Sequence, residues 1–134
     1  MTTNRTLSEL KKAGFRITTV RKQLLELLEN TTRPITVTEI LNKVKANKTT
    51  IYREIETLLD RGYLIEVYFS DGVKRYELSN RKHHHHVVCV KCKSVSDVVV
   101  VDDFSKTEKA VSYQTNFKII RHSLEFFGLC ANCR

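Results

Sequence analysis

Two Cys-x-x-Cys pairs constrain this chain more than any other feature, because together they use every cysteine it has. The pairs are Cys89-Val-Lys-Cys92 and Cys130-Ala-Asn-Cys133. Each presents two sulfur atoms from one tight turn, and two such turns that meet form the closed tetrahedral cage that structural zinc prefers. The spacing therefore predicts a structural Zn²⁺ site made of all four thiolates. Four inert buried cysteines and a redox pair are the alternatives.

Length and charge limit the class of protein. With 134 residues, 41% of them hydrophobic, the chain can form one domain or two small ones that share a metal. No apolar stretch is long enough to span a membrane, and residues 1–5 do not lead into a signal peptide, so we expect a cytoplasmic protein with no membrane partner. Cytoplasmic thiols stay reduced, which favours metal ligation over disulfides. The net charge of +8 favours a polyanionic partner.

The first half of the chain has the pattern of short helices. Gly14 and Pro34 interrupt it. The candidate N-caps are Thr18 or Thr19 for the second helix and Thr36 for the third, and the fourth helix is expected to start near Asn47 or Thr49. Apolar residues recur at helical spacing in four stretches, which are Leu7 and Leu10, then Val20, Leu24, Leu27 and Leu28, then Val37, Ile40, Leu41 and Val44, and finally Ile51, Ile55, Leu58 and Leu59.

A β-hairpin follows the helices. Residues 63–69 and 73–78 are β-prone and flank a Ser70-Asp71-Gly72 turn, and Asp-Gly between two such runs favours a hairpin. Short helices followed by a hairpin predict a winged helix-turn-helix. In that layout the last helix enters the DNA major groove and the hairpin, or wing, follows the backbone or minor groove.

The second half predicts a small α/β domain. Residues 87–90, 95–101 and 117–129 are β-rich, and residues 105–113 are a helix candidate. Strands that pair with a partner chain would account for so much apolar edge, which favours a homodimer. We therefore predict an α+β chain with a winged helix-turn-helix domain at 1–78, a hinge at 79–82, and a small α/β dimerisation domain at 83–134 that is stapled by the four-cysteine zinc site.

Four consecutive histidines, residues 83–86, precede the first cysteine pair. If this run enters a strand, alternation sends His84 and His86 to one face and His83 and His85 to the other. One run can then serve two metal sites. An expression tag and a solvated polar loop are the alternatives, and the internal position argues against a tag.

The predicted fourth helix carries the candidate DNA contacts. Threonine methyls and tyrosine rings can contact thymine methyls, which favours an A·T-rich operator, and arginine can pair with guanine or phosphate. A solvated charged helix face is the alternative, and Glu54 and Glu56 weaken a purely electrostatic argument. The base-facing candidates are Thr49, Thr50, Tyr52 and Arg53, and the phosphate candidates are Lys48 beside them, Arg16 before the second helix, and Lys74 and Arg75 on the wing.

Taken together, these motifs resemble the ferric uptake regulator family of metal-dependent repressors. The resemblance runs from about Leu7 to Cys133 and rests on Tyr52-Arg53, residues 76–78, the histidine run with the first cysteine pair, and His122-Ser-Leu ahead of the second pair. It implies a homodimer that binds a palindromic operator in double-stranded DNA when a regulatory metal is held at the hinge. Members of the family sense iron, zinc, manganese or peroxide.

The resemblance also implies two ligand sets beside the structural zinc. The regulatory set is Glu77, His84, His86 and Asp97, and the second set is His83, His85 and His122. This chain departs from the family pattern in having Arg33-Pro34 where a further histidine is common, and His85 and Ser105 where acidic residues are usual. Replacing carboxylate by imidazole favours Zn²⁺ over harder ions, with Fe²⁺ and Mn²⁺ as the other candidates.

Ligands from both sides of the predicted hinge would let a metal favour one arrangement of the two domains, which allosteric control of DNA binding requires. Two other functions stay open. One is a peroxide sensor in which bound iron oxidises a ligand histidine, and the other is a zinc storage or delivery protein that does not bind DNA. We expect no catalytic residues, because a four-cysteine cage is closed and no His-Glu-x-x-His motif is present.

Overall fold

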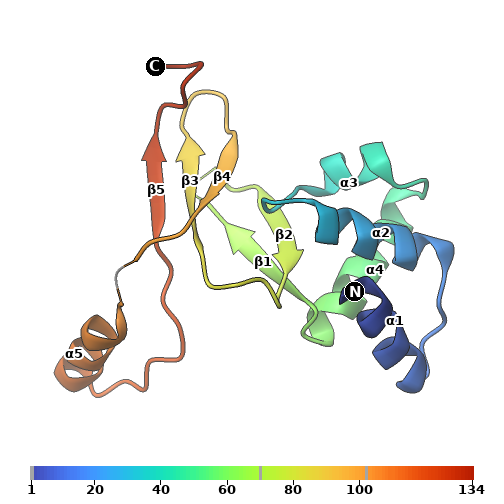
Figure 1. Cartoon of the computed structure of the whole chain (residues 1–134), viewed down its shortest axis with the longest axis horizontal. Helices are drawn as coiled ribbons and strands as arrows, with labels where there is room; N and C mark the ends of the chain where they lie inside the picture. The colour runs from blue at the N-terminus through green and yellow to red at the C-terminus, as the bar shows by residue number, and fades with distance from the viewer. Residues whose placement is uncertain (1, 70, 102) are drawn as a thin grey trace. The chain divides into compact units, whose positions relative to one another are not determined.

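The structure is a computed structural model that describes residues 2–69, 71–101 and 103–134. Its contacts divide the chain into two compact units, Met1–Arg81 and Lys82–Arg134, and each is described by itself. Within the described residues, the first unit holds four helices and a hairpin and the second holds a three-stranded sheet with one helix. The predicted α+β fold class is therefore confirmed (Figure 1). Among the described helices, none is both long and apolar enough to cross a membrane.

Side-chain caps set the helix starts in the first unit. The helices are α1 (Thr2–Lys12), α2 (Thr19–Asn30), α3 (Val37–Lys43) and α4 (Lys48–Asp60). The Thr18 hydroxyl accepts a hydrogen bond from the Arg21 amide at 3.1 Å, and the Asn47 side chain accepts one from the Thr50 amide at 2.8 Å. Thr36 and Glu39 form a reciprocal capping box. Of the two caps predicted for α2, Thr18 is the one used. Asn47, one of the two predicted start positions of the fourth helix, is the N-cap of α4.

Two strands complete the first unit. β1 (Leu64–Tyr68) and β2 (Lys74–Leu78) pair antiparallel, with Leu64 opposite Leu78 and Tyr68 opposite Lys74. In the predicted turn between them, Ser70 lies outside the described residues. Gly62, at φ +77°, makes the turn from α4 into β1 in a backbone region that suits glycine.

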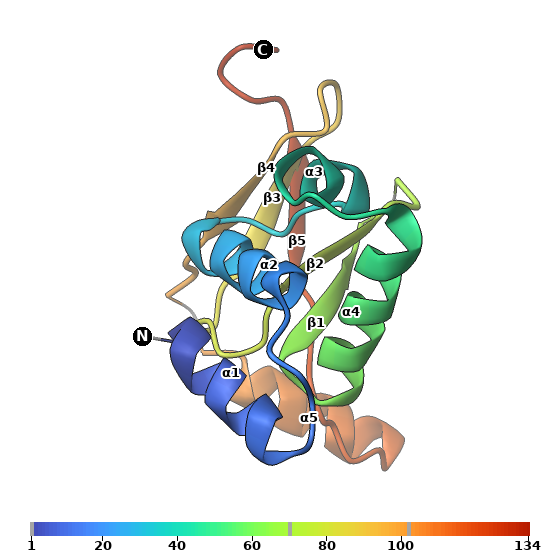
Figure 2. The same ribbon diagram turned by 90° about the vertical axis from the view of Figure 1, so that its right-hand side faces the viewer.

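The main hydrophobic core lies in the first unit. α4 packs against β1 and α2 against β2 (Figure 2). Ile51 and Leu58 of α4, Leu24 of α2 and Ile40 of α3 have no exposed surface, and each such side chain contributes about 1.5–3 kcal/mol through burial. Because α4 turns this apolar face inward, its opposite face is exposed.

The second unit is a sheet in the order β4-β3-β5. The central strand β3 (His85–Cys89) pairs antiparallel with β4 (Val95–Val98) and parallel with β5 (Glu125–Gly128). The remaining helix, α5 (Ser105–Thr115), lies beyond one end of the sheet and has no buried residues (Figure 1). Strand content here is smaller than the sequence predicts, since only the last part of the β-rich run 117–129 forms a strand.

Candidate metal centres and DNA-contacting surface

The parallel pairing of β3 and β5 brings the four cysteines together. Cys89 ends β3 opposite Gly128 of β5, and parallel strands end at the same edge of a sheet. Both Cys-x-x-Cys turns therefore begin at that edge. Lys93, directly after the first pair, has a left-handed backbone conformation with φ +66°. The four Sγ atoms all lie within 4.8 Å of one another, and those of Cys92 and Cys130 are 3.8 Å apart. The cluster is able to hold a structural zinc.

Neighbouring groups shift the pKa values of these thiols in different directions. The amides of Cys92 and Cys130 lie 3.5 and 3.4 Å from the Sγ atom of Cys89, and their hydrogen bonds lower the pKa of Cys89 to about 6. The Ser94 hydroxyl, 3.1 Å from the Sγ atom of Cys92, lowers the pKa of that thiol. Contact with Cys130 raises the pKa of Cys133 to about 12. One thiolate thus forms readily, and four together need a cation among them.

The first histidine set lies on β3 and just before it. His86 and Asp97 are cross-strand partners, and the Nε2 atom of His86 is 3.5 Å from a carboxylate oxygen of Asp97. The rings of His84 and His86 have centroids 4.9 Å apart, and the Nδ1 atom of His84 is 2.6 Å from the Lys82 carbonyl. Ligand atoms of His84, His86 and Asp97 lie within 4.8 Å of one another. Strand alternation thus places the two imidazoles and the carboxylate on one face.

The second histidine set lies on the opposite face. His83, His85 and His122 offer ring nitrogens within 4.8 Å of one another. The Nδ1 atom of His122 is 2.6 Å from a carboxylate oxygen of Glu108 on α5, while its Nε2 atom is buried without a hydrogen-bond partner among the described residues. A histidine oriented by a carboxylate through one nitrogen is typical of metal ligands. Burial, helped by His83 and His122, lowers the pKa of His85 and favours the neutral imidazole that binds metals.

Glu108 is a residue that the sequence reasoning did not place in this set. Ser105 occupies the position considered for an acidic residue, but its amide and hydroxyl bond to Asp103 instead, each at 2.9 Å. Glu108 lies about one helical turn further on, so its carboxylate reaches His122 from α5. That spacing is the signal in the sequence that could have identified it.

Glu77 belongs to the first unit, on β2, and its side chain is 3% exposed. The Nη1 atom of Arg81 donates a hydrogen bond to its Oε2 atom at 3.0 Å. The Nη2 atom of the same guanidinium donates to the Thr32 carbonyl at 3.1 Å. Arg81 is the second residue that the sequence reasoning left out.

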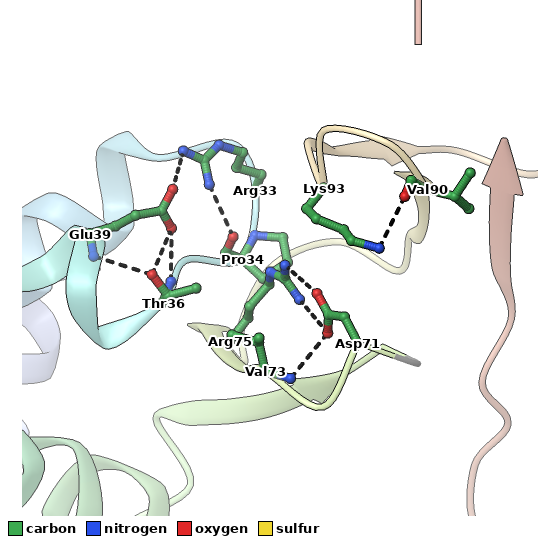
Figure 3. A network of polar contacts seen from close by, with 9 residues as sticks. All are labelled: Arg33, Pro34, Thr36, Glu39, Asp71, Val73, Arg75, Val90 and Lys93. Atoms are coloured by element: carbon green, nitrogen blue, oxygen red, sulfur yellow. Dashed lines mark hydrogen bonds and ion pairs between the residues drawn. The ribbon is translucent and has the colours of Figure 1, made fainter. Parts of the chain in front are cut away.

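Hydrogen bonds between the loop after α2 and the first turn of α3 fix the conformation of that loop. The Nη2 atom of Arg33 bonds to a carboxylate oxygen of Glu39 at 2.8 Å, and the other oxygen of that carboxylate accepts the Thr36 amide (Figure 3). Arg33 also donates to the Pro34 carbonyl at 3.4 Å. Arg33 is therefore used to stabilise the start of α3.

The exposed face of α4 carries most of the DNA candidates. Thr49, Tyr52 and Arg53 are exposed there and Thr50 is half-buried. Lys48 is exposed and its ammonium lies 5.9 Å from the Tyr52 ring centre. Only residues 45 and 46 separate the C-cap of α3, Val44, from the N-cap of α4, Asn47, so the turn between the helices is short.

Outside α4 the basic candidates differ from one another. Arg16 is exposed, and Lys74 lies 3.8 Å from Glu66 on the hairpin. Arg75, the other basic candidate on the hairpin, is buried and has a partner within the first unit. Its guanidinium is buried and bonds to both carboxylate oxygens of Asp71, at 2.8 and 3.2 Å (Figure 3). The same guanidinium lies 5.0 Å from the centre of the Phe69 ring. Arg75 therefore links β2 to the hairpin turn, and a contact with a phosphate would require this ion pair to break.

Comparison with known proteins gives consistent results. Residues 12–127 match the sequence profile of the ferric uptake regulator family. A ferric uptake regulation protein from Legionella pneumophila is 30% identical over 132 residues, spanning 94% of this chain and 96% of that protein. A peroxide-responsive repressor from Staphylococcus epidermidis is 26% identical over 133 residues, spanning 96% and 87%. Among solved structures, the Vibrio cholerae ferric uptake regulator aligns with a TM-score of 0.77 at 28% identity, over 93% of this chain and 99% of that one.

Proposed function

We propose that bound metal controls DNA binding by this chain. The chain belongs to the ferric uptake regulator family of metal-responsive, DNA-binding transcriptional regulators. Members of the family are regulators rather than enzymes, and they bind DNA as dimers. In this proposal two kinds of metal site divide the work. One maintains the fold of the second unit, and the other changes the affinity for DNA.

The structural site consists of Cys89, Cys92, Cys130 and Cys133. A bound Zn²⁺ supplies the positive charge that lets four neighbouring thiols ionise together. The amide hydrogen bonds to Cys89 support this role, because they stabilise the first thiolate of the set. By fixing the end of β3, the cysteines also hold the strand that carries His85 and His86.

The regulatory site consists of His84, His86 and Asp97 together with Glu77. The single observation that carries it is the convergence of two imidazoles and a carboxylate on one face of β3 and β4. Adding Glu77 makes the ligand set span residues 79–82, which we propose as the hinge between a DNA-binding domain at 1–78 and a metal-binding dimerisation domain at 83–134. Ligands on both sides give the metal-bound protein a preferred domain arrangement, and a coupling of about 1–3 kcal/mol changes DNA affinity roughly 5–150-fold.

His83, His85 and His122 form a second divalent-metal site in this proposal. The buried Nε2 atom of His122 and the carboxylate of Glu108 on its other nitrogen support it. With three imidazoles, the set suits Zn²⁺ better than Mn²⁺. For the regulatory site, with two carboxylates, Fe²⁺, Mn²⁺ and Zn²⁺ are all candidates.

The DNA-binding surface is the exposed face of α4, with contributions from Arg16 and Lys74. Thr49, Thr50, Tyr52 and Arg53 would contact base edges, and Lys48 would contact a phosphate. We propose an A·T-rich operator, because threonine and tyrosine suit thymine methyl groups. A palindromic operator follows from a two-fold symmetric dimer.

A pair of variants tests the regulatory site. Replacing both His84 and His86 with Gln should abolish the metal-dependent gain in affinity for an operator selected from random DNA, while leaving about one zinc per chain at the cysteine cage. Lys82→Gln is the matched control, because it changes an exposed neighbour that offers no ligand. Unchanged metal dependence in the histidine variant would refute the assignment.

Peroxide sensing is the second candidate function. It is favoured by the similarity to the peroxide-responsive repressor and by the 3.5 Å approach of His86 to Asp97. In that case iron and peroxide should add one oxygen atom to a peptide that contains His84 or His86. Mass spectrometry of the iron-loaded protein distinguishes this outcome from plain metal sensing.

A further inference from the structure

The contact between Glu77 and Arg81 has a consequence for metal binding. Glu77 is a 3% exposed carboxylate, and burying such a charge without compensation costs several kcal/mol. The guanidinium of Arg81, whose side chain is 23% exposed, donates to the Oε2 atom of Glu77 at 3.0 Å. Arg81 therefore supplies positive charge to Glu77 within the first unit.

The same guanidinium is also anchored elsewhere in that unit. Its second arm donates to the Thr32 carbonyl at 3.1 Å, in the loop that follows α2. This loop is itself fixed to β2, because Ile35 and Tyr76 exchange two backbone hydrogen bonds at 3.0 and 2.8 Å. Arg81 thus joins the end of β2 to a fixed loop, and it is the last residue of the first unit before Lys82.

We propose that Arg81 is an internal cation that competes with the regulatory metal for Glu77 and so sets the metal concentration at which this regulator responds. The proposal rests on the proposed function, in which Glu77 is a ligand. It concerns competition for one carboxylate and involves no change in covalent bonds. Arg81 acts through Glu77 and is a positioning residue, not a ligand.

Competition follows from charge and hydrogen bonding. A divalent ion and a guanidinium repel one another, and both use the lone pairs of the same carboxylate. A metal that binds Glu77 must therefore displace Arg81 or lie close to its positive charge. Both outcomes lower the affinity of the regulatory site for the metal. The bond of the second arm to the Thr32 carbonyl holds the guanidinium beside Glu77 and so favours Arg81 in this competition.

A double-mutant cycle measures this competition directly. After the cysteine site has been loaded, Zn²⁺ affinity is measured against a chromophoric chelator for the native chain, Arg81→Gln, Glu77→Gln and the double variant. Every chain also carries His122→Gln, which removes the second histidine site. Arg81→Gln should bind Zn²⁺ roughly tenfold more tightly, equivalent to about 1.4 kcal/mol. In the Glu77→Gln background the same change should alter the affinity less than about twofold. Arg81→Lys, which keeps the charge but loses the planar fork, should lie between native and Arg81→Gln.

Arg33→Gln is the matched control, because it removes the same charge from the neighbouring loop, where the arginine pairs with Glu39. It should leave Zn²⁺ affinity unchanged. If Glu77→Gln weakens Zn²⁺ binding but Arg81→Gln does not strengthen it, the competition is refuted while the ligand role of Glu77 stands. If Glu77→Gln has no effect on Zn²⁺ binding, the ligand role itself fails, and the competition fails with it.

Nuclear magnetic resonance of the arginine side chains tests the same proposal without a variant at Glu77. The guanidinium protons of Arg81, assigned with Arg81→Lys, should exchange slowly with water in the metal-free regulatory site and quickly after Zn²⁺ is added. Protection that persists at saturating Zn²⁺ would overturn the proposal.

Discussion

The two units of this chain are stabilised in different ways. All but three of the buried hydrophobic side chains among the described residues lie in the first unit, and the exceptions are Val88, Cys89 and Val95. The second unit instead leaves large apolar side chains exposed, including Tyr113 at 91% and Ile120 at 90%. Hydrophobic burial can therefore hold the first unit together, whereas we expect the second unit to depend on a bound metal and a partner surface.

The largest effect should come from removing the structural metal. Cys89→Ser, or strong chelation, removes about 10–16 kcal/mol of metal-binding free energy, which exceeds the stability of a small domain. We expect β3 and β5 to lose amide-hydrogen protection while α4 keeps it, measured by hydrogen exchange with mass spectrometry. Ser96→Ala, an exposed change on β4, is the control. Full protection of β3 in metal-free protein would contradict the contrast between the units.

The converse experiment targets the core of the first unit. Ile51→Ala deletes a fully buried side chain of α4 and should reduce the free energy of unfolding by about 2–5 kcal/mol. Urea unfolding measures this loss, and zinc content should stay at the native level because the cysteines lie in the other unit. Val99→Ala, at a 76% exposed position, should change stability by less than about 0.5 kcal/mol. Loss of zinc from Ile51→Ala would show that the units do not fold independently.

A partner surface is the second support expected for the second unit. Phe126 and Phe127 on the edge strand β5 are 43% and 50% exposed. If this strand contributes to the dimer, Phe127→Asp should weaken dimerisation by about 2 kcal/mol or more, roughly 30-fold. Analytical ultracentrifugation checks this, with Tyr68→Asp in the first unit as the control. A dimer of native affinity in Phe127→Asp would place the interface elsewhere.

The smallest expected effect concerns helix caps, which also differ between the units. α3 has a capping box, whereas the N-cap residue of α5, Phe104, makes no side-chain cap hydrogen bond. Burial raises the pKa of Glu39, but hydrogen bonds from Arg33 and Thr36 outweigh it, so the pKa lies below the usual 4.5. The stabilisation is therefore present above pH 4.5 and is lost as the pH falls through the lowered pKa.

Glu39→Gln should consequently destabilise the first unit by less than about 1 kcal/mol at neutral pH, since the carboxylate is partly exposed. The difference from the native chain should vanish at low pH. Urea unfolding between about pH 3 and pH 7 measures it, and Glu56→Gln on the exposed side of α4 is the control. A difference that stays constant with pH would mean that the charge of Glu39 is not involved.

Local patterns predicted the first unit well. The inward side of α4 follows from the spacing of Ile51, Ile55 and Leu58, and Thr36 marks the start of α3. The second unit was harder, because β5 depends on pairing with β3 and not on its own composition. In the sequence, Arg75 also resembles a solvent-exposed cation, and only the folded turn brings Asp71 to it. Long-range partners such as Glu108 and His122 are fixed only by tertiary structure.

The most direct test of the division between the two kinds of metal site combines two measurements on one sample. Zinc content per chain and operator affinity are determined before and after mild chelation. We predict that one zinc per chain remains, that the fold of the second unit is retained, and that operator affinity falls roughly 5–150-fold. If operator affinity falls only when the last zinc leaves, the cysteine site would control DNA binding itself and our account would be wrong.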